Sequence, residues 1–147
     1  MRAPDDARTI LRATPEKETP VYGSRRNAEA NQRSADRRQR EDDAPRLSAE
    51  IPKLLTLAIA IADGEAGAIG GSEHVRHVVV ARAPALFEMK CGNRDCKEGG
   101  HDITHELVRE LRAGKTRIEG SDPCHGNVGS SRCAYVVRYV ATATYRP

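Results

Sequence analysis

The chain has 147 residues, of which 38% are hydrophobic, 31% are charged and only 3% are aromatic, with no tryptophan and one phenylalanine. This length fits one domain with a tail, and the shortage of aromatic residues leaves a weak core that an additional cross-link would help to stabilise. A net charge of +3 does not by itself indicate a nucleic-acid partner, and the lack of a signal peptide or of an apolar run of roughly 18 residues predicts a soluble, cytoplasmic protein with no membrane partner.

The first 50 residues differ in composition from the rest of the chain. They contain four prolines, 11 basic and 10 acidic residues, and almost no periodic apolar positions. Such a segment cannot bury enough apolar surface to offset the entropy lost on ordering, so residues 1–50 are predicted to form a disordered arm. Residues 24–40 carry six arginines against two acids, and their composition favours a transient or partner-induced helix.

These six arginines are the candidate contacts to nucleic acid, because a basic segment can neutralise phosphates. They are Arg25, Arg26, Arg33, Arg37, Arg38 and Arg40. The alternative is that the arm is a solvated, flexible tail without a partner.

The folded domain is predicted to span residues 51–147. Near its start, apolar residues alternate with threonine and alanine, a period of two that predicts a strand of about seven residues. The apolar members of this alternation are Leu55, Leu57, Ile59 and Ile61. The glycine-rich stretch 63–73 predicts a loop and the β-branched stretch 74–82 a second strand, so the two strands are expected to form a hairpin. Residues 86–90 are predicted to form a short third strand.

The clearest helix is predicted at residues 101–114, where apolar residues recur at helical spacing. The apolar positions are Ile103, Leu107, Val108 and Leu111. Asp102 or Thr104 is expected to cap the N-terminus of this helix, and Gly114 is expected to adopt the left-handed conformation that ends many helices.

A short strand at residues 115–120 and the longest strand, at residues 134–146, follow the helix. One face of the longest strand carries Tyr135, Val137, Tyr139, Ala141, Ala143 and Tyr145. The tyrosines could stack on the bases of single-stranded nucleic acid, but the apolar residues between them favour packing against the helix. Strands on both sides of one helix predict an α+β fold with a small, mainly antiparallel sheet.

Four cysteines in the C-terminal half are the strongest chemical signal. Four residues separate Cys91 from Cys96, eight separate Cys124 from Cys133, and glycines lie in both loops. Zinc-binding thiolates must converge to about 2.3 Å from the ion, and glycine permits the sharp turns that this requires. Because thiols stay reduced in the cytoplasm, the pattern predicts one structural Zn²⁺ bound by all four cysteines. Disulfides, redox-active thiols and four unconnected cysteines are the alternatives.

Two cysteine-bearing turns brought together by a sheet and a helix resemble the general layout of zinc ribbons and treble clefs. The resemblance covers residues 86–140. Neither cysteine pair has the Cys-x2-Cys spacing usual in those folds, so the resemblance implies an architecture and no particular role.

Three histidines lie close to the cysteines in the sequence. His101 and His105 are four residues apart, which places two imidazoles on one face of a helix, and His125 adjoins Cys124. One histidine could replace a cysteine in a three-Cys, one-His site, or join a catalytic site with an open position. Because four thiolates already complete a tetrahedral shell, the favoured interpretation is that His101 and His105 cap the helix or face solvent.

These features predict a non-enzymatic binding or adaptor domain with a structural zinc ion. Its partner is expected to be nucleic acid or protein, with a preference for nucleic acid because of the arginine-rich arm. No phosphate-binding loop, dinucleotide fingerprint or nucleophile elbow occurs, and no small-molecule substrate is evident. The alternatives are a module that pairs with another chain or with itself through a sheet edge or apolar face, and a metal-dependent or thiol enzyme.

Overall fold

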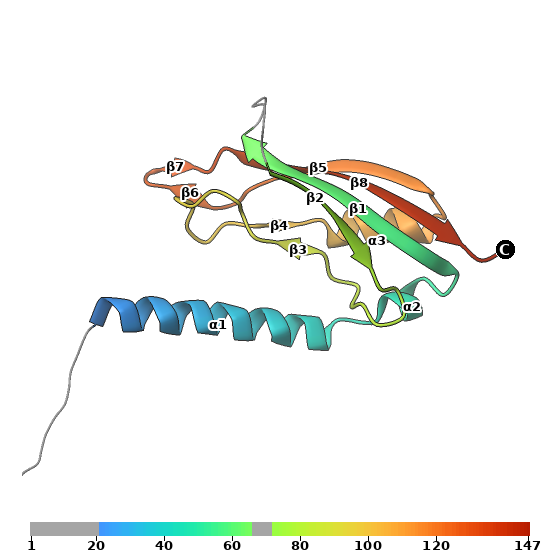
Figure 1. Cartoon of the computed structure of the whole chain (residues 1–147), viewed down its shortest axis with the longest axis horizontal. Helices are drawn as coiled ribbons and strands as arrows, with labels where there is room; N and C mark the ends of the chain where they lie inside the picture. The colour runs from blue at the N-terminus through green and yellow to red at the C-terminus, as the bar shows by residue number, and fades with distance from the viewer. Residues whose placement is uncertain (1–20, 66–71) are drawn as a thin grey trace, which may run out of the picture. The chain divides into compact units, whose positions relative to one another are not determined.

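The computed structural model describes residues 21–65 and 72–147 (Figure 1). The chain divides into two units after Arg40. Helix α1 spans Val21–Asp43. Its residues up to Arg40 are the described part of the first unit, and the residues from Glu41 onward belong to the second unit. Nearly all of its described side chains are exposed. In the described ranges, no helix is long and apolar enough to cross a membrane.

The C-terminal part of the predicted disordered arm, residues 1–50, belongs to the folded unit in the structure. Residues 1–20 lie outside the described part, and α1 covers the arginine-rich segment whose composition favours helix. The second unit begins at Glu41 rather than at residue 51, and it includes the short helix α2, Leu47–Glu50. Leu47 is fully buried and its backbone N–H donates to the carbonyl of Ala83 at 2.9 Å. One apolar residue within a charged stretch gives no periodic signal, so its burial could not be predicted.

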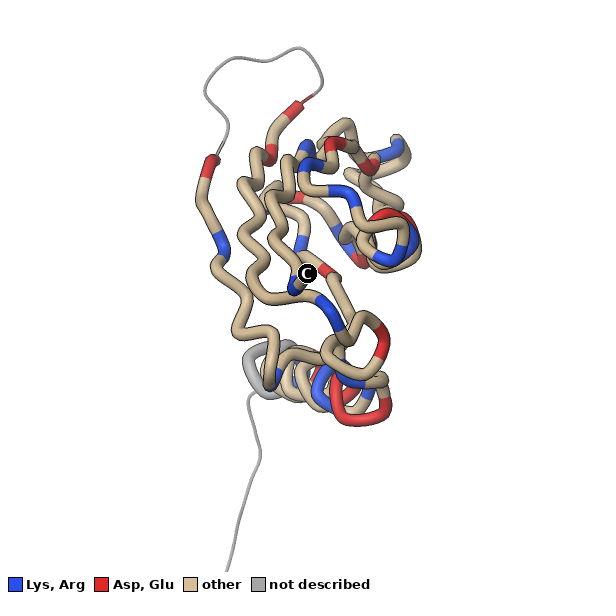
Figure 2. Tube along the Cα trace, turned by 90° about the vertical axis from the view of Figure 1, so that its right-hand side faces the viewer, with Lys and Arg blue, Asp and Glu red and all other residues tan. Residues whose placement is uncertain are grey.

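A four-stranded antiparallel sheet forms the centre of the second unit. Its strands are β1 Leu54–Glu65, β2 Ser72–Val78, β5 Arg117–Pro123 and β8 Tyr135–Tyr145, in the order β2–β1–β8–β5. The long strands β1 and β8 pair in the middle of the sheet (Figure 1). Long stretches of the strands carry no charged residue (Figure 2). The predicted α+β fold with a small antiparallel sheet is confirmed.

Two short ribbons and one longer helix complete the second unit. Strand β3, Glu88–Met89, pairs with β4, His101–Asp102, and β6, Asn127–Val128, pairs with β7, Ser131–Arg132. Helix α3, Thr104–Arg112, follows β4 directly. The described part of this unit therefore contains α2 as well as the one helix that was predicted.

The hydrophobic core lies between the sheet and α3. It includes Leu57, Ile59 and Ile61 of β1, Val137, Tyr139, Ala141 and Ala143 of β8, and Leu107, Val108 and Leu111 of α3. Tyr139 is only 2% exposed, and its hydroxyl donates a hydrogen bond to the carboxylate of Glu106 on α3. Tyr139 therefore packs into the core as the packing interpretation predicts, whereas Tyr135 and Tyr145 are half-buried.

Leu55 departs from the alternation predicted for β1. The register between β1 and β8 shifts between Leu54 and Thr56, so one extra residue lies in β1 at this point. Leu54 takes the buried position, while Leu55 is 48% exposed. A bulge of this kind turns one residue out of the ladder, and period-two counting cannot detect it.

The helix α3 begins later than predicted, because residues 101–102 belong to strand β4. The N-cap position is Ile103 and has no side-chain capping bond, so neither Asp102 nor Thr104 is the N-cap. Asp102 Oδ1 accepts the N–H of Thr104, the first residue of the helix, at 2.9 Å. The hydroxyl of Thr104 accepts the N–H of Phe87 at 2.7 Å and so ties the helix start to the chain before β3. Gly114 has a φ of 79°, which confirms the left-handed end of the helix.

The hairpin predicted from the first two strands is confirmed. Strands β1 and β2 pair in antiparallel register, with Leu57 opposite Val78 and Asp63 opposite Ser72. The strand predicted at residues 74–82 begins two residues earlier and ends at Val78. Most of the predicted glycine-rich loop, residues 66–71, lies outside the described residues.

Candidate metal centre

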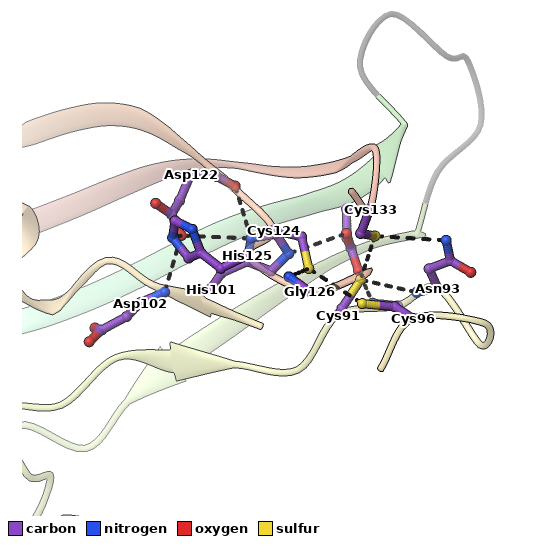
Figure 3. A network of polar contacts seen from close by, with 12 residues as sticks. Cys91, Asn93, Cys96, His101, Asp102, Asp122, Cys124, His125, Gly126 and Cys133 are labelled. Atoms are coloured by element: carbon purple, nitrogen blue, oxygen red, sulfur yellow. Dashed lines mark hydrogen bonds and ion pairs between the residues drawn. The ribbon is translucent and has the colours of Figure 1, made fainter. Parts of the chain in front are cut away.

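The four cysteines meet at one point (Figure 3). Their Sγ atoms all lie within 4.8 Å of one another, and all four are free thiols. The Sγ atoms of Cys91 and Cys133 are 3.6 Å apart, as are those of Cys96 and Cys124. Each close pair therefore joins one cysteine of the first loop to one of the second, at a distance well beyond the roughly 2.0 Å of a disulfide. The cluster could hold a metal ion.

The first loop, which carries Cys91 and Cys96, connects β3 to β4. It turns around Asn93, whose backbone carbonyl accepts the N–H of Cys96 at 3.1 Å and whose side-chain Oδ1 accepts the N–H of Asp95 at 3.0 Å. Asparagine favours such turns because its side chain can bond to the backbone two residues later. The loop therefore brings the two thiols together by local hydrogen bonding.

The second loop connects β5 to β8 and contains the ribbon β6–β7 between its two cysteines. Its base is closed by two hydrogen bonds: the N–H of Cys124 donates to the carbonyl of Tyr135, and that of Cys133 to the carbonyl of Gly126, both at 2.9 Å. Gly129 turns the ribbon with a φ of 61°, a conformation that glycine adopts without strain. The strands β5 and β8 thus fix the backbone positions of Cys124 and Cys133.

The two loops are also joined directly to each other. Lys97 of the first loop and Asn127 of the second exchange two backbone hydrogen bonds, of 2.9 and 3.2 Å. The protein alone therefore holds the two cysteine pairs in register, so part of the ordering cost of a metal site is met by the backbone.

The spacing of the thiols fits a tetrahedral ion. Four sulfurs at about 2.3 Å from a central ion must be about 3.8 Å from one another. The two measured separations of 3.6 Å and the upper limit of 4.8 Å bracket this value. Four sulfur donors suit ions that prefer thiolate, such as zinc or iron, rather than magnesium or calcium.

Backbone amides point at two of the sulfurs in an equivalent way. The N–H of Asn93 donates to Sγ of Cys91 and the N–H of Gly126 donates to Sγ of Cys124, both at 3.4 Å. In each case the amide lies two residues after the cysteine. The side-chain amide of Asn93 also points to Sγ of Cys133, at 3.8 Å (Figure 3). Such donors stabilise the thiolate form that a metal requires.

Gly99 and Gly126 have no side chain, and this makes room for the thiols. A Cβ on Gly99 would clash with the Sγ atoms of both Cys96 and Cys124, and a Cβ on Gly126 would clash with Sγ of Cys96 and with the backbone of Gly99. The backbones of the two loops therefore approach each other and the sulfurs more closely than any other residue would allow.

The thiols differ in how readily they lose a proton. Burial raises the pKa of Cys96 to about 11 and raises that of Cys91 even further. Burial acts in the same direction on Cys124, but amide donors from Gly126 and Gly100 outweigh it and lower the pKa of that thiol. Cys124 is therefore a thiolate more readily than Cys91 and Cys96, which keep their protons until a cation displaces them.

The three histidines do not join the cluster, since the group that could hold an ion contains cysteines only. His105 is exposed, as predicted, and His125 is exposed with its Nε2 3.9 Å from Asp122 Oδ2. The prediction that His101 caps the helix or faces solvent is wrong. His101 is 3% exposed, because it lies on β4 between β3 and the end of β5 and not on the helix.

His101 belongs to a polar group that the sequence did not reveal. Its Nδ1 lies 2.9 Å from the backbone carbonyl of Asp122, which can only accept a hydrogen bond, and its Nε2 lies 4.0 Å from Asp63 Oδ1. Asp63 Oδ2 accepts the N–H of Gly92 at 2.8 Å. The group therefore connects the end of β1 to residues adjoining both cysteine loops. Its members lie far apart in the sequence and share no spacing motif.

The six candidate arginines all lie on α1. Arg33, Arg37 and Arg40 follow one another at helical spacing and are exposed, so they lie on one face of the helix. Arg25 and Arg38 are exposed at other angles around the axis. Arg26 lies on the same helix, seven residues before Arg33.

The chain matches no protein-family model, no curated protein and no solved structure. Function is therefore inferred from the site and the surface alone.

Proposed function

We propose that the protein is a non-enzymatic binding module of the cytoplasm, in which one structural zinc ion stabilises the folded unit and helix α1 binds nucleic acid. The strongest support is the convergence of four thiol sulfurs within 4.8 Å from two loops that are distant in sequence. The zinc ligands in this proposal are Cys91, Cys96, Cys124 and Cys133. A reducing compartment fits the proposal because it keeps these thiols free.

Zinc fits this donor set better than other common ions. It is tetrahedral, it accepts four thiolates, and it needs no further ligand when it has a structural role. The four sulfurs would fill the tetrahedral shell and leave no open coordination position for water or substrate, which argues against a catalytic role for the ion. Its contribution would be to hold the β3–β4 loop against the β5–β8 loop, in a domain with little aromatic core.

Native mass spectrometry of the full chain tests the metal site. We expect the mass of one zinc ion per chain, and loss of the folded signal in circular dichroism when a chelator removes it. The C124S variant should lose the ion, whereas H125A, which changes the neighbouring exposed side chain, should retain it. A metal-free wild type whose mass is lower by two hydrogens per bond would indicate disulfides and contradict the proposal.

The arginine face of α1 supports nucleic acid as the partner. Arg33, Arg37 and Arg40 extend along one side of the helix over about 10 Å, from a rise of 1.5 Å per residue. Duplex DNA carries one negative charge per roughly 1.7 Å of axis, so several phosphates lie within that length. Glu29 and Asp36 lie four residues before Arg33 and Arg40 and so flank this face, but residues 24–40 still hold six arginines against these two acids. A row of guanidinium groups suits phosphate contacts that do not depend on sequence.

Fluorescence anisotropy with labelled RNA and DNA tests this partner. The variant R33A/R37A removes two charges from the arginine face, and R25A/R38A removes two charges from elsewhere on α1. We expect R33A/R37A to weaken binding more and to reduce the salt dependence by about one unit per lost phosphate contact. Equal effects of both variants, or no binding by the wild type at low salt, would contradict a role for this face.

A metal-dependent enzyme is the competing class, and X-ray absorption at the zinc edge separates it from the proposal. Four sulfur neighbours at about 2.3 Å would support a structural ion. An exchangeable oxygen or nitrogen ligand would instead favour an open, catalytic position and contradict the structural assignment.

A further inference from the structure

The two edges of the sheet differ in how they are protected. Strand β5 contains Gly120 and Pro123, residues that weaken or block further pairing, and its end contacts β4 through a hydrogen bond from the N–H of Asp102 to Asp122 Oδ2, at 3.2 Å. Strand β2 contains neither glycine nor proline and pairs with β1 on one side only. Within the described residues no strand covers its other side (Figure 1).

The outward side of β2 also exposes apolar residues. Val75 is opposite Ala60 of β1, whose neighbours Ile59 and Ile61 point into the core. Val75 therefore lies on the outer face of the sheet, where it is 57% exposed. Glu73 and His77 share this face because side chains alternate along a strand, and both are exposed. An unprotected edge with exposed valine is a surface on which another strand can pair.

We propose that two copies of this chain associate by antiparallel pairing of β2 with β2 across a two-fold axis, which extends the sheet to eight strands. A two-fold axis perpendicular to the sheet keeps the outer face continuous, so it pairs only residues of the same face. The register centred on Val75 satisfies this condition and uses all residues of Ser72–Val78. Registers centred on neighbouring residues leave the ends of the strand unpaired.

Complementary hydrogen-bonding groups support the same register, because a carboxylate accepts what an imidazole N–H donates. With Val75 opposite Val75, Glu73 of each copy lies opposite His77 of the other, and this contact occurs twice by symmetry. On the inner side, His74 lies opposite Arg76, whose guanidinium is held 5.8 Å from the ring centre of Phe87. The outer face thus brings together one apolar pair and two acid–histidine pairs. The proposal depends on neither the zinc ion nor helix α1.

Sedimentation velocity of the metal-loaded full chain, treated with nuclease and run at high salt, tests the association. We expect the mass to rise with concentration from 16.1 kDa to twice that value, and to stop there because a two-fold contact closes. V75K should raise the dissociation constant at least about tenfold, because it places two like charges opposite each other. V79K is the matched control: Val79 is 62% exposed but lies beyond the end of β2, so dimerisation should persist.

A charge exchange tests the register. E73K should weaken the dimer because it removes the acceptor opposite His77, and H77E should weaken it because it places two carboxylates opposite each other. The double variant E73K/H77E places lysine opposite glutamate and should restore it. A wild type that stays monomeric throughout the micromolar range would overturn the proposal. So would a dimer that V75K leaves intact, or a double variant that is as weak as the single ones.

Discussion

Nε2 of His101 and Oδ1 of Asp63 face each other at 4.0 Å in the interior, and neither atom has a hydrogen-bond partner. The other atoms of both side chains are bonded: His101 Nδ1 to the carbonyl of Asp122, and Asp63 Oδ2 to the N–H of Gly92. Gly92 follows Cys91 and Asp122 precedes Cys124 by two residues. The pair therefore holds the end of β1 against both cysteine loops, although His101 Nε2 and Asp63 Oδ1 form no hydrogen bond with each other.

The first prediction is that D63N stabilises the protein. A neutral imidazole that donates from Nδ1 presents a bare acceptor at Nε2, so a carboxylate opposite it places two acceptors together. Asparagine can accept the N–H of Gly92 through Oδ1 and donate to Nε2 through Nδ2. We expect the free energy of unfolding at pH 8, measured by urea denaturation, to rise by about 1 kcal/mol. A decrease would mean that Nε2 carries a proton and needs the charge of Asp63.

Much of the sheet could be predicted from the sequence because its strands follow simple periodicity. Leu57, Ile59 and Ile61 occupy the alternate positions that the core covers, and Val137 and Tyr139 do the same in β8. The helix α3 could be predicted for the same reason, because its apolar residues recur at the helical spacing of three to four residues. Local patterns of this kind need no knowledge of the partner strand.

The polar interior could not be predicted, because it depends on contacts between distant segments. His101 resembles a helix residue in sequence, and only the pairing of β3 with β4 shows that it is buried. The exposure of Leu55 depends on a register shift against β8. The cysteines could be proposed as one set from residue type, but which of them are adjacent depends on the strands that carry the loops.

The second prediction concerns the buried hydroxyl of Tyr139, which donates to Glu106. Y139F leaves a carboxylate without its donor, and we expect the free energy of unfolding to fall by about 1.5–3 kcal/mol. E106Q keeps an acceptor in place and should cost less. Urea denaturation of the zinc-loaded proteins at pH 7 compares the two variants, and equal stability of Y139F and wild type would show that the bond contributes nothing.

The third prediction concerns alkaline pH. Burial, together with the carboxylate of Glu106, raises the pKa of Tyr139 above its ordinary value of 10.0. The protonated phenol is therefore favoured in the folded state, and the stability that it contributes is complete below pH 10 and is lost as the pH rises towards the folded pKa. The wild type should lose stability above pH 10 more steeply than Y139F. Parallel pH profiles of unfolding free energy would contradict this assignment.

The fourth prediction is that zinc binding releases protons. Burial raises the pKa of Cys96 to about 11 and that of Cys91 further, so both thiols are protonated in the metal-free protein at pH 7. Zinc must displace these protons, and its apparent affinity should fall as the pH falls. Isothermal titration in buffers of different ionisation enthalpy counts the released protons, of which we expect at least the two from Cys91 and Cys96. Heats that do not depend on the buffer would exclude this mechanism.

The fifth prediction is that G99A disrupts the metal site. The added Cβ would overlap the Sγ atoms of Cys96 and Cys124, one from each loop, so the sulfurs must move apart. We expect G99A to weaken zinc binding at least about tenfold in competition with a chromophoric chelator, because a small displacement breaks tetrahedral geometry. G129N is the matched control: Gly129 has a φ of 61° that asparagine tolerates, and a Cβ there meets no atom within 4 Å. Unchanged affinity in G99A would show that the thiols do not converge on an ion in this geometry.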